Sequence, residues 1–231
     1  MIFYKLYLLV GLLEVTLEFL GISPGVTLTK PLLMPLLAVA LWREHTANKV
    51  TLNVLIAALF FSWLGDVALL FQSEHAIYFV LGLCAFLLAH VLYISAMRLG
   101  FESSGANLRR RIVTLIAVAS LIVLVVIYFE REGNALYTGV LRFAVPLYAL
   151  VLGMMVVVAA CQGRGNERYA VLLFSGALLF MFSDLTIALG AFSGALDFFS
   201  ESTRSGVIMA TYILAQFLII RGMVAQYNGT S

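Results

Sequence analysis

Two aspartates stand inside long apolar stretches of this chain. Asp66 lies in FFSWLGDVALLF (60–71) and Asp184 in LLFMFSDLTIAL (178–189). A carboxylate in a hydrocarbon medium costs about 2.5–3.5 kcal/mol, so such residues normally face a protein interior and have partners. Two neighbouring carboxyl groups can share a proton and act as general acid and general base. The simpler interpretation is that both acids only join helices by hydrogen bonds.

Other ionisable side chains are expected at a similar depth, since a helix rises 1.5 Å per residue. The embedded set comprises Glu14, Glu18, Lys30, Asp66 and Asp184, with Arg142 at its border. Lys30 and Arg142 would each pair with an acid, whereas His90 and Tyr93 would lie deeper. We therefore predict one polar cavity in one half of the bilayer.

The composition indicates what holds these residues. Of 231 residues, 63% are hydrophobic and 11% charged, and the mean hydropathy is +1.05. Soluble domains carry about a quarter charged residues, so this chain has too little polar material to cover a water-facing surface. Open strands cannot cross a bilayer, and the alternation of a membrane barrel is missing. We predict an all-α integral membrane protein with a single domain over residues 1–231.

Eight segments are apolar over about the twenty residues that cross a bilayer as a helix. In the second and shortest segment, Pro31 and Pro35 would fall in the first turns, where proline is tolerated or kinks the helix. The predicted spans are 4–22, 28–42, 49–71, 77–98, 111–129, 138–161, 168–191 and 204–225.

The basic residues predict the orientation. With eight spans, both termini and the even-numbered loops share one face, which collects ten of the fourteen lysines and arginines. Arg131 and Arg204 fall on the other face, and Lys30 and Arg142 lie just inside helix starts. The positive-inside rule then places both termini in the cytoplasm and the cavity toward the outer side. We interpret the RRR run at 109–111 as part of this signal, and expect no nucleic-acid partner.

An internal repeat is visible around the two aspartates. The segment holding Asp66 aligns with that holding Asp184, and the following apolar segments set His90 against Gln216. Four spans per repeat give both halves the same orientation, related by a pseudo-two-fold axis along the membrane normal. The prediction is two parallel four-helix repeats, about residues 1–105 and 106–231.

The histidines and cysteines do not predict a metal site or a disulfide. His45, His75 and His90 show no metal-ligand spacing, and both Cys84 and Cys161 fall in apolar stretches. We expect no cofactor.

Five blocks of sequence, in order, make the chain similar to the YhhN family of eight-span membrane proteins. One departure is Leu185, where a small polar residue would be expected after the aspartate. The blocks are KPLLMPLL (30–37), FSWLGDVALL (61–70), GLCAFLLAHVLYI (82–94), GALLFMFSD (176–184) and MATYILAQFLI (209–219).

The animal members of that family are lysoplasmalogenases, so the resemblance implies hydrolysis of the vinyl ether bond of a lysophospholipid-type substrate. The products would be a fatty aldehyde and a glycerophospho-headgroup alcohol. Asp66 and Asp184 would be the catalytic acid and base, in either order. It also implies a bacterial cytoplasmic membrane as the location. The residues expected to bind substrate or line the cavity are Lys30, Arg142, His90, Tyr93, Glu18, Tyr212 and Gln216.

Two other classes of protein share these features. A proton-coupled transporter of a small or lipid-like substrate also carries repeats around embedded acids. Proline or glycine pairs in mid-span would favour transport, and they are scarce here. A lipid-binding or scaffolding protein without chemistry is the third class. The sequence leaves the oligomeric state open.

Overall fold

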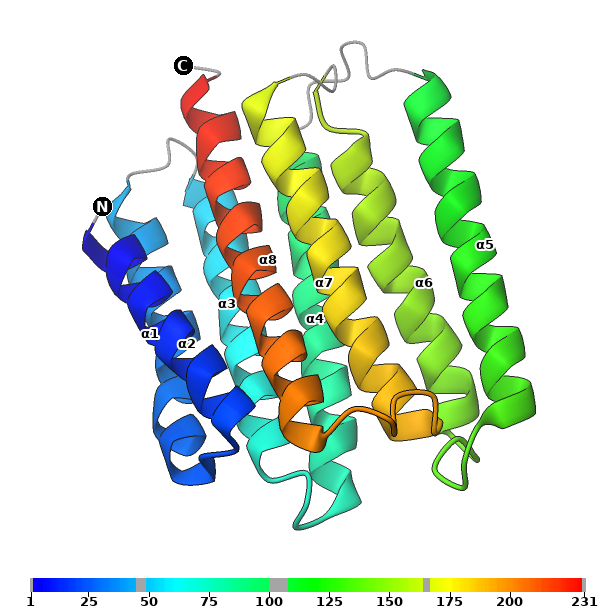
Figure 1. Cartoon of the computed structure of the whole chain (residues 1–231). Coiled ribbons are helices and arrows are strands. Elements are labelled where there is room, and N and C mark those ends of the chain that lie inside the picture. Colours follow the sequence, from blue (N-terminus) through cyan, green and yellow to red (C-terminus); the bar gives the residue numbers. More distant parts are fainter. Residues whose placement is uncertain (1, 45–48, 100–107, 164–166, 230–231) are drawn as a thin grey trace.

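The computed structural model describes residues 2–44, 49–99, 108–163 and 167–229. His45, and Arg164 as one of the ten basic residues assigned to the face of the termini, lie outside the described residues. Within them the chain forms eight helices, which confirms the all-α prediction (Figure 1). The helices are α1 (Ile2–Leu20), α2 (Ser23–Arg43), α3 (Lys49–Leu70), α4 (Ala76–Leu99), α5 (Leu108–Glu132), α6 (Leu141–Ala160), α7 (Arg168–Phe192) and α8 (Glu201–Gly229).

Seven of these helices, α2 to α8, are long and apolar enough to cross a membrane. The protein is therefore an integral membrane protein. The remaining helix, α1, carries Lys5, Glu14 and Glu18 within its 19 residues. Because of these three charged residues, α1 carries more charge than the composition expected of a membrane-spanning helix allows.

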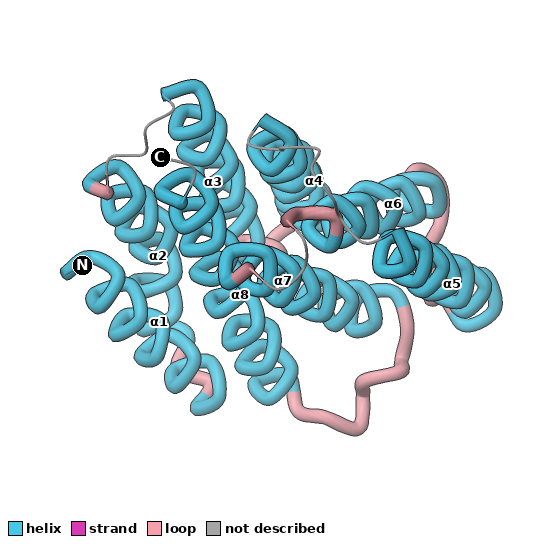
Figure 2. The backbone as a smooth tube through the Cα atoms, turned by 90° about the horizontal axis from the view of Figure 1, so that it is seen from above, coloured by secondary structure: helices cyan, strands magenta, loops and turns pink. Residues whose placement is uncertain are grey.

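Seven helices pack into a closed ring, in the order α1, α2, α3, α4, α6, α7, α8 and back to α1. Helix α5 packs on α6 at the outer edge of the bundle (Figure 2). Both termini lie at the same end of the molecule (Figure 1). Within the first half, α1 packs on α2, α2 on α3 and α3 on α4, and the second half has the matching contacts α5–α6, α6–α7 and α7–α8. The contacts between the halves do not match in this way, because α1 packs on α8 whereas α4, among the described residues, packs on α6 rather than on α5. The two-fold repeat therefore stays a prediction.

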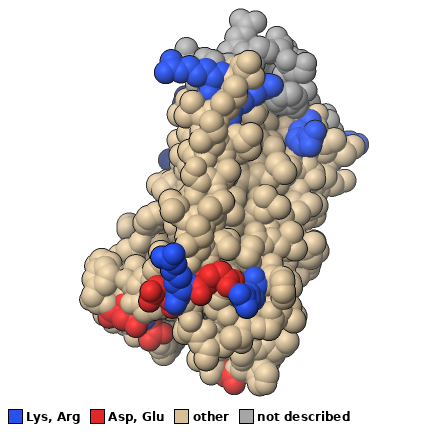
Figure 3. All heavy atoms as spheres, turned by 90° about the vertical axis from the view of Figure 1, so that its right-hand side faces the viewer, with Lys and Arg blue, Asp and Glu red and all other residues tan. Residues whose placement is uncertain are grey.

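Charged side chains gather at the two ends of the bundle. On the face drawn in Figure 3, several lysine and arginine side chains lie near the end that holds the termini. Acidic side chains, with a few cations beside them, lie toward the opposite end (Figure 3). Between these two ends, the same face is made mostly of residues other than Lys, Arg, Asp and Glu, as contact with lipid tails requires (Figure 3).

Helix α2 departs from the prediction at its start. It begins with Pro24 in the first turn, so Pro31 and Pro35 lie inside the helix and not in its first turns, as we had predicted. Because Pro35 has no N–H, it cannot donate to the carbonyl oxygen of Pro31 four residues earlier. The Trp63 indole Nε1 donates to that oxygen instead, at 3.0 Å. A side chain of α3 thus replaces the backbone hydrogen bond that α2 lacks at Pro35.

We expect Trp63→Phe to destabilise the fold by about 1–3 kcal/mol, because it leaves a carbonyl oxygen unpaired in an apolar setting. The measurement is thermal unfolding of the purified protein in detergent. Trp42→Phe is the matched control, since Trp42 is exposed on the same helix as Pro31. Equal unfolding temperatures for the two variants would contradict this role.

Candidate active site

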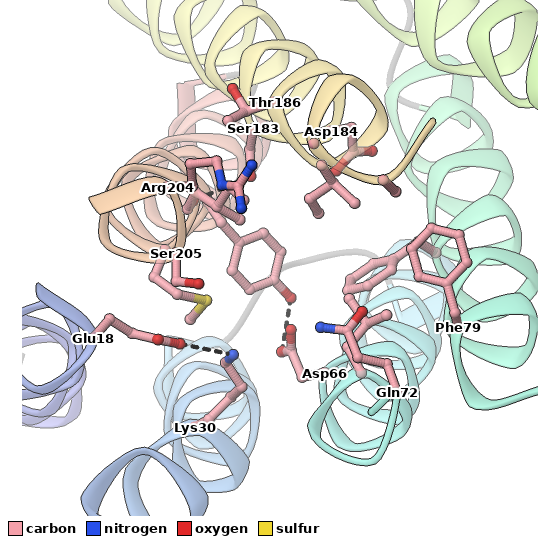
Figure 4. A pocket seen from close by; sticks show the side chains of 18 of the residues that line it. Glu18, Lys30, Asp66, Gln72, Phe79, Ser183, Asp184, Thr186, Arg204 and Ser205 are labelled. Carbon is pink, nitrogen blue, oxygen red and sulfur yellow. Dashed lines mark hydrogen bonds and ion pairs between the residues drawn. The ribbon is translucent and has the colours of Figure 1, made fainter. Parts of the chain in front are cut away.

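A polar cavity of about 220 Å³ lies inside the ring. Its walls include Glu18 near the end of α1, Gln72 just after α3 and Glu201 at the start of α8, which places it toward the end opposite the termini. Figure 4 shows both aspartates, Asp66 from α3 and Asp184 from α7, at this cavity. The fold therefore brings together the two acids that lie 118 positions apart in the sequence.

Asp66 is held by a tyrosine from the other half of the chain. The Tyr212 hydroxyl donates to Asp66 Oδ2 at 2.9 Å, and the Tyr212 ring meets the rings of Phe86 and Phe180 edge-on. Gly65 permits this packing, because a Cβ there would lie 2.7 Å from the Phe86 ring. Asp66 is only 3% exposed, and the Tyr212 hydroxyl fixes one oxygen of its carboxyl group.

A buried hydrogen-bond network supports Tyr212 from behind. The Gln216 Nε2 donates to the Tyr212 hydroxyl at 3.2 Å and to Ser62 Oγ at 3.0 Å. The Tyr93 hydroxyl donates to Gln216 Oε1, which fixes the orientation of that amide. Tyr93 and Gln216 therefore lie behind Asp66 and do not line the polar cavity, whereas Tyr212 does.

Asp184 has an equivalent setting with different partners. The Tyr148 hydroxyl of α6 donates to Asp184 Oδ2 at 2.6 Å, and His90 Nε2 lies 3.5 Å from the same oxygen. The His90 ring is fully buried and meets Phe180 and Tyr148 edge-on. Because these partners share Oδ2, the other oxygen, Oδ1, is the one available to a substrate.

Lys30 and Glu18 form an ion pair at the cavity wall. Lys30 Nζ lies 3.0 Å from Glu18 Oε1, and both residues line the cavity (Figure 4). One turn earlier on α1, Glu14 is fully buried and accepts a hydrogen bond from Thr29. The expected pairing of Lys30 with an acid is present.

Arg142 is not where we expected it. It pairs with Glu130 at the end of α5, its side chain is 56% exposed, and it does not line the cavity. The short connection between α5 and α6 brings Glu130 beside it and holds it outside the ring. A different cation, Arg204, lines the cavity, with its Nη1 3.0 Å from Asp197 Oδ1.

Sequence reasoning missed Tyr148, Ser62 and the site role of Arg204. Tyr148 follows Pro146 inside an apolar span, and a tyrosine in mid-span is a signal that could have been used. Arg204 was counted only as a charge on the outer face. Nothing in the local sequence of Ser62 distinguishes it from a helix-packing serine.

Comparison with known proteins agrees with the sequence blocks. The model of the YhhN family matches residues 26–223, a range that includes Lys30, both aspartates and Tyr212. The chain belongs to the YhhN family. No solved structure matches this YhhN protein.

Two curated relatives are lysoplasmalogenases. Lysoplasmalogenase TMEM86A of Bos taurus is 33% identical over 172 residues, which cover 71% of this YhhN chain and 62% of the relative. The Homo sapiens protein of the same name is 31% identical over 172 residues, with the same shares of the two chains. The chain thus spans less than two thirds of the length of the curated relatives it matches.

Proposed function

We propose that this protein is an intramembrane hydrolase of the vinyl ether bond of lysoplasmalogen-type lipids. The observation that carries the proposal is the pair Asp66 and Asp184, each bonded to a tyrosine and both lining one cavity in a ring of apolar helices. Membership of the YhhN family and similarity to lysoplasmalogenases support the choice of bond.

The reaction needs an acid and a base. A vinyl ether is hydrolysed when its β-carbon is protonated, which gives an oxocarbenium ion that water captures. The resulting hemiacetal collapses to an aldehyde and an alcohol. One carboxyl group in its acid form supplies the proton, and the other, ionised, stabilises the cation and activates the water. Asp66 and Asp184 are the proposed pair.

The surroundings of the two acids suit this chemistry. Apolar helices exclude bulk water, so the ionised carboxylate stabilises the cation more strongly than it would in water. Tyr148 and Tyr212 each fix one oxygen of a carboxyl group and leave the second for the substrate. His90, Tyr93 and Gln216 position these groups from behind.

The charges of the cavity wall suit a zwitterionic headgroup. Lys30 and Arg204 supply cations for a lipid phosphate, and Glu18 and Glu201 supply carboxylates for an amine. Lys30 is already paired with Glu18 and Arg204 with Asp197, so a phosphate would share each cation with a carboxylate.

We expect Lys30→Gln and Arg204→Gln each to raise KM about ten-fold, the equivalent of one charged hydrogen bond. Arg142→Gln is the matched control, because Arg142 lies outside the cavity and its loss should leave KM unchanged. The measurement is aldehyde release at varied concentrations of lysoplasmalogen. An equal effect of all three substitutions would contradict a headgroup role for Lys30 and Arg204.

The proposed location is the cytoplasmic membrane of a bacterium, with α1 as an eighth span and both termini in the cytoplasm. The common end of the termini and the cluster of basic side chains there support this orientation (Figures 1 and 3). The cavity would then open toward the outer side.

The direct test is release of fatty aldehyde from lysoplasmalogen by detergent-purified protein. We expect release from the vinyl ether lipid and none from the matched lysolipid with a saturated ether. Uptake of intact lipid into sealed vesicles with no aldehyde would instead favour a transporter and would contradict the proposed function.

A further inference from the structure

Three cavities meet at Asp184. Besides the polar cavity, two smaller cavities of about 30 and 60 Å³ have both Asp184 and Tyr148 in their walls. Asp66 lines the polar cavity but neither of the smaller two. Asp184 therefore lies at the boundary between the polar cavity and the two smaller apolar cavities.

The two smaller cavities follow each other. Val145 and Ala188 line both of them, and aside from Asp184 and the Tyr148 hydroxyl their walls are aliphatic and aromatic. Each has room for only a few water-sized groups. So narrow an apolar space takes the first few methylene groups of one unbranched hydrocarbon chain and leaves no room for a second chain.

The larger of the two leads toward the lipid-facing edge of the bundle. Its walls come from α5, α6 and α7, with Leu121, Ile122 and Val125 contributed by α5. Helix α5 packs on α6 and stands outside the ring (Figure 2). A chain in this cavity would reach the bilayer beside α5, which gives a lipid a lateral way in.

We propose that a single-chain lipid lies across Asp184, with its headgroup in the polar cavity and the first part of its tail in the two apolar cavities, from which the rest of the chain continues into the bilayer beside α5. A single-chain lipid is inferred because the first cavity has charged walls and the two smaller cavities have apolar walls. The small volume of the apolar cavities leaves room for one chain only. The chemical identity of the bond at the junction rests on the proposed function.

This orientation assigns separate roles to the two aspartates. In a vinyl ether the β-carbon lies on the tail side of the bond and the oxygen on the headgroup side. Asp184, at the entrance to the tail cavities, donates its proton to the β-carbon, and the double-bond electrons form the new C–H bond. The ether oxygen then shares a lone pair with the α-carbon, which becomes the oxocarbenium centre.

Asp66 completes the reaction from the headgroup side. It takes a proton from a water molecule in the polar cavity, and the oxygen of that water bonds to the α-carbon to give the hemiacetal. The bond between the α-carbon and the glycerol oxygen then breaks. The proton on Asp66 passes to the glycerol oxygen, and the hemiacetal hydroxyl proton returns to Asp184. One water is consumed and both carboxyl groups regain their starting forms.

The binding orientation is tested without catalysis, with a saturated lysophospholipid that carries a diazirine on one of the first carbons of its chain. In nanodiscs it should label α5 and α6 near Leu121 and Ile122. Ala188→Phe, which fills the passage between the apolar cavities, should lower this labelling about ten-fold. Val171→Phe, on the lipid-exposed surface of the same helix, is the matched control and should not change it. A two-chain phospholipid with the same diazirine measures labelling from the bilayer alone.

Labelling that is unaffected by Ala188→Phe, or equal for the two lipids, would overturn the orientation. If the labelling is as expected but the protein releases no aldehyde, the orientation is supported and the proposed function is contradicted. The experiment therefore distinguishes a failure of the orientation from a failure of the proposed function. Release of aldehyde with labelling elsewhere would retain the function and overturn the orientation.

The assignment of roles is tested with azide, an anion that attacks the oxocarbenium carbon without a general base. Azide should restore substrate consumption in Asp66→Ala at least about ten-fold, with an α-azido ether as the product, and should not do so in Asp184→Ala. Asp66→Asn replaces Asp66→Ala if the alanine variant does not fold. Rescue of Asp184→Ala, or of neither variant, would overturn the assignment.

Discussion

Asp184→Asn is expected to lower kcat for aldehyde release by about 10²- to 10⁴-fold, because an amide cannot act as the general acid. The substitution keeps the shape of the side chain, and the amide oxygen can still accept the hydrogen bond from Tyr148. Asp184 is 7% exposed, so a larger or charged replacement would disturb the packing more. The loss should therefore appear in turnover and not in the thermal stability of the protein.

The matched control for this substitution is Glu130→Gln, the same change at a carboxylate that lies outside the cavity and pairs with Arg142. It should leave kcat unchanged. Tyr148→Phe should have a smaller effect than Asp184→Asn, since Tyr148 positions the acid and supplies no proton to the substrate. Normal turnover by folded Asp184→Asn would exclude the acid role.

Asp66→Asn is expected to lower kcat by about 10²- to 10³-fold, because a neutral amide cannot stabilise the cationic intermediate. The hydrogen bond from Tyr212 has an acceptor in either residue, and the network through Gln216 and Ser62 stays intact. KM should change little, because Lys30 and Arg204 make the contacts proposed for the headgroup.

Steady-state kinetics and thermal unfolding of Asp66→Asn and Tyr212→Phe distinguish chemistry from structure. We expect a much smaller loss of kcat for Tyr212→Phe, which removes the donor and leaves the carboxylate. An equally large loss in both variants would mean that the network, and not the charge of Asp66, supports turnover.

Composition and hydrophobic length alone determined the all-α class and the positions of the helices along the chain. Segments of about twenty apolar residues must form helices in a bilayer, where each backbone group needs a partner within its own segment. For that reason the eight predicted segments coincide with the eight helices of the described chain. The prediction erred on α2, because apolarity was used to find its start and the turn that begins at Ser23 is not apolar.

The sequence also identified three of the acids that line the cavity but not Glu201, because a carboxyl group inside an apolar helix has few stable places other than a polar interior, whereas Glu201 stands at a helix start. Asp66, Asp184, Glu18 and Lys30 all line the cavity on that principle. Depth along a helix can be counted from the sequence. The direction in which a side chain faces around the bundle cannot.

Facing directions were decided only by the packing of the helices. Arg142 and Arg204 both lie near the start of a helix. Arg142 nevertheless pairs with Glu130 of α5 outside the ring, whereas Arg204 faces the cavity inside it. Tyr148 reaches Asp184 because α6 packs between α4 and α7. Long-range contacts of this kind depend on which helices become neighbours, and local hydrophobicity does not encode that order.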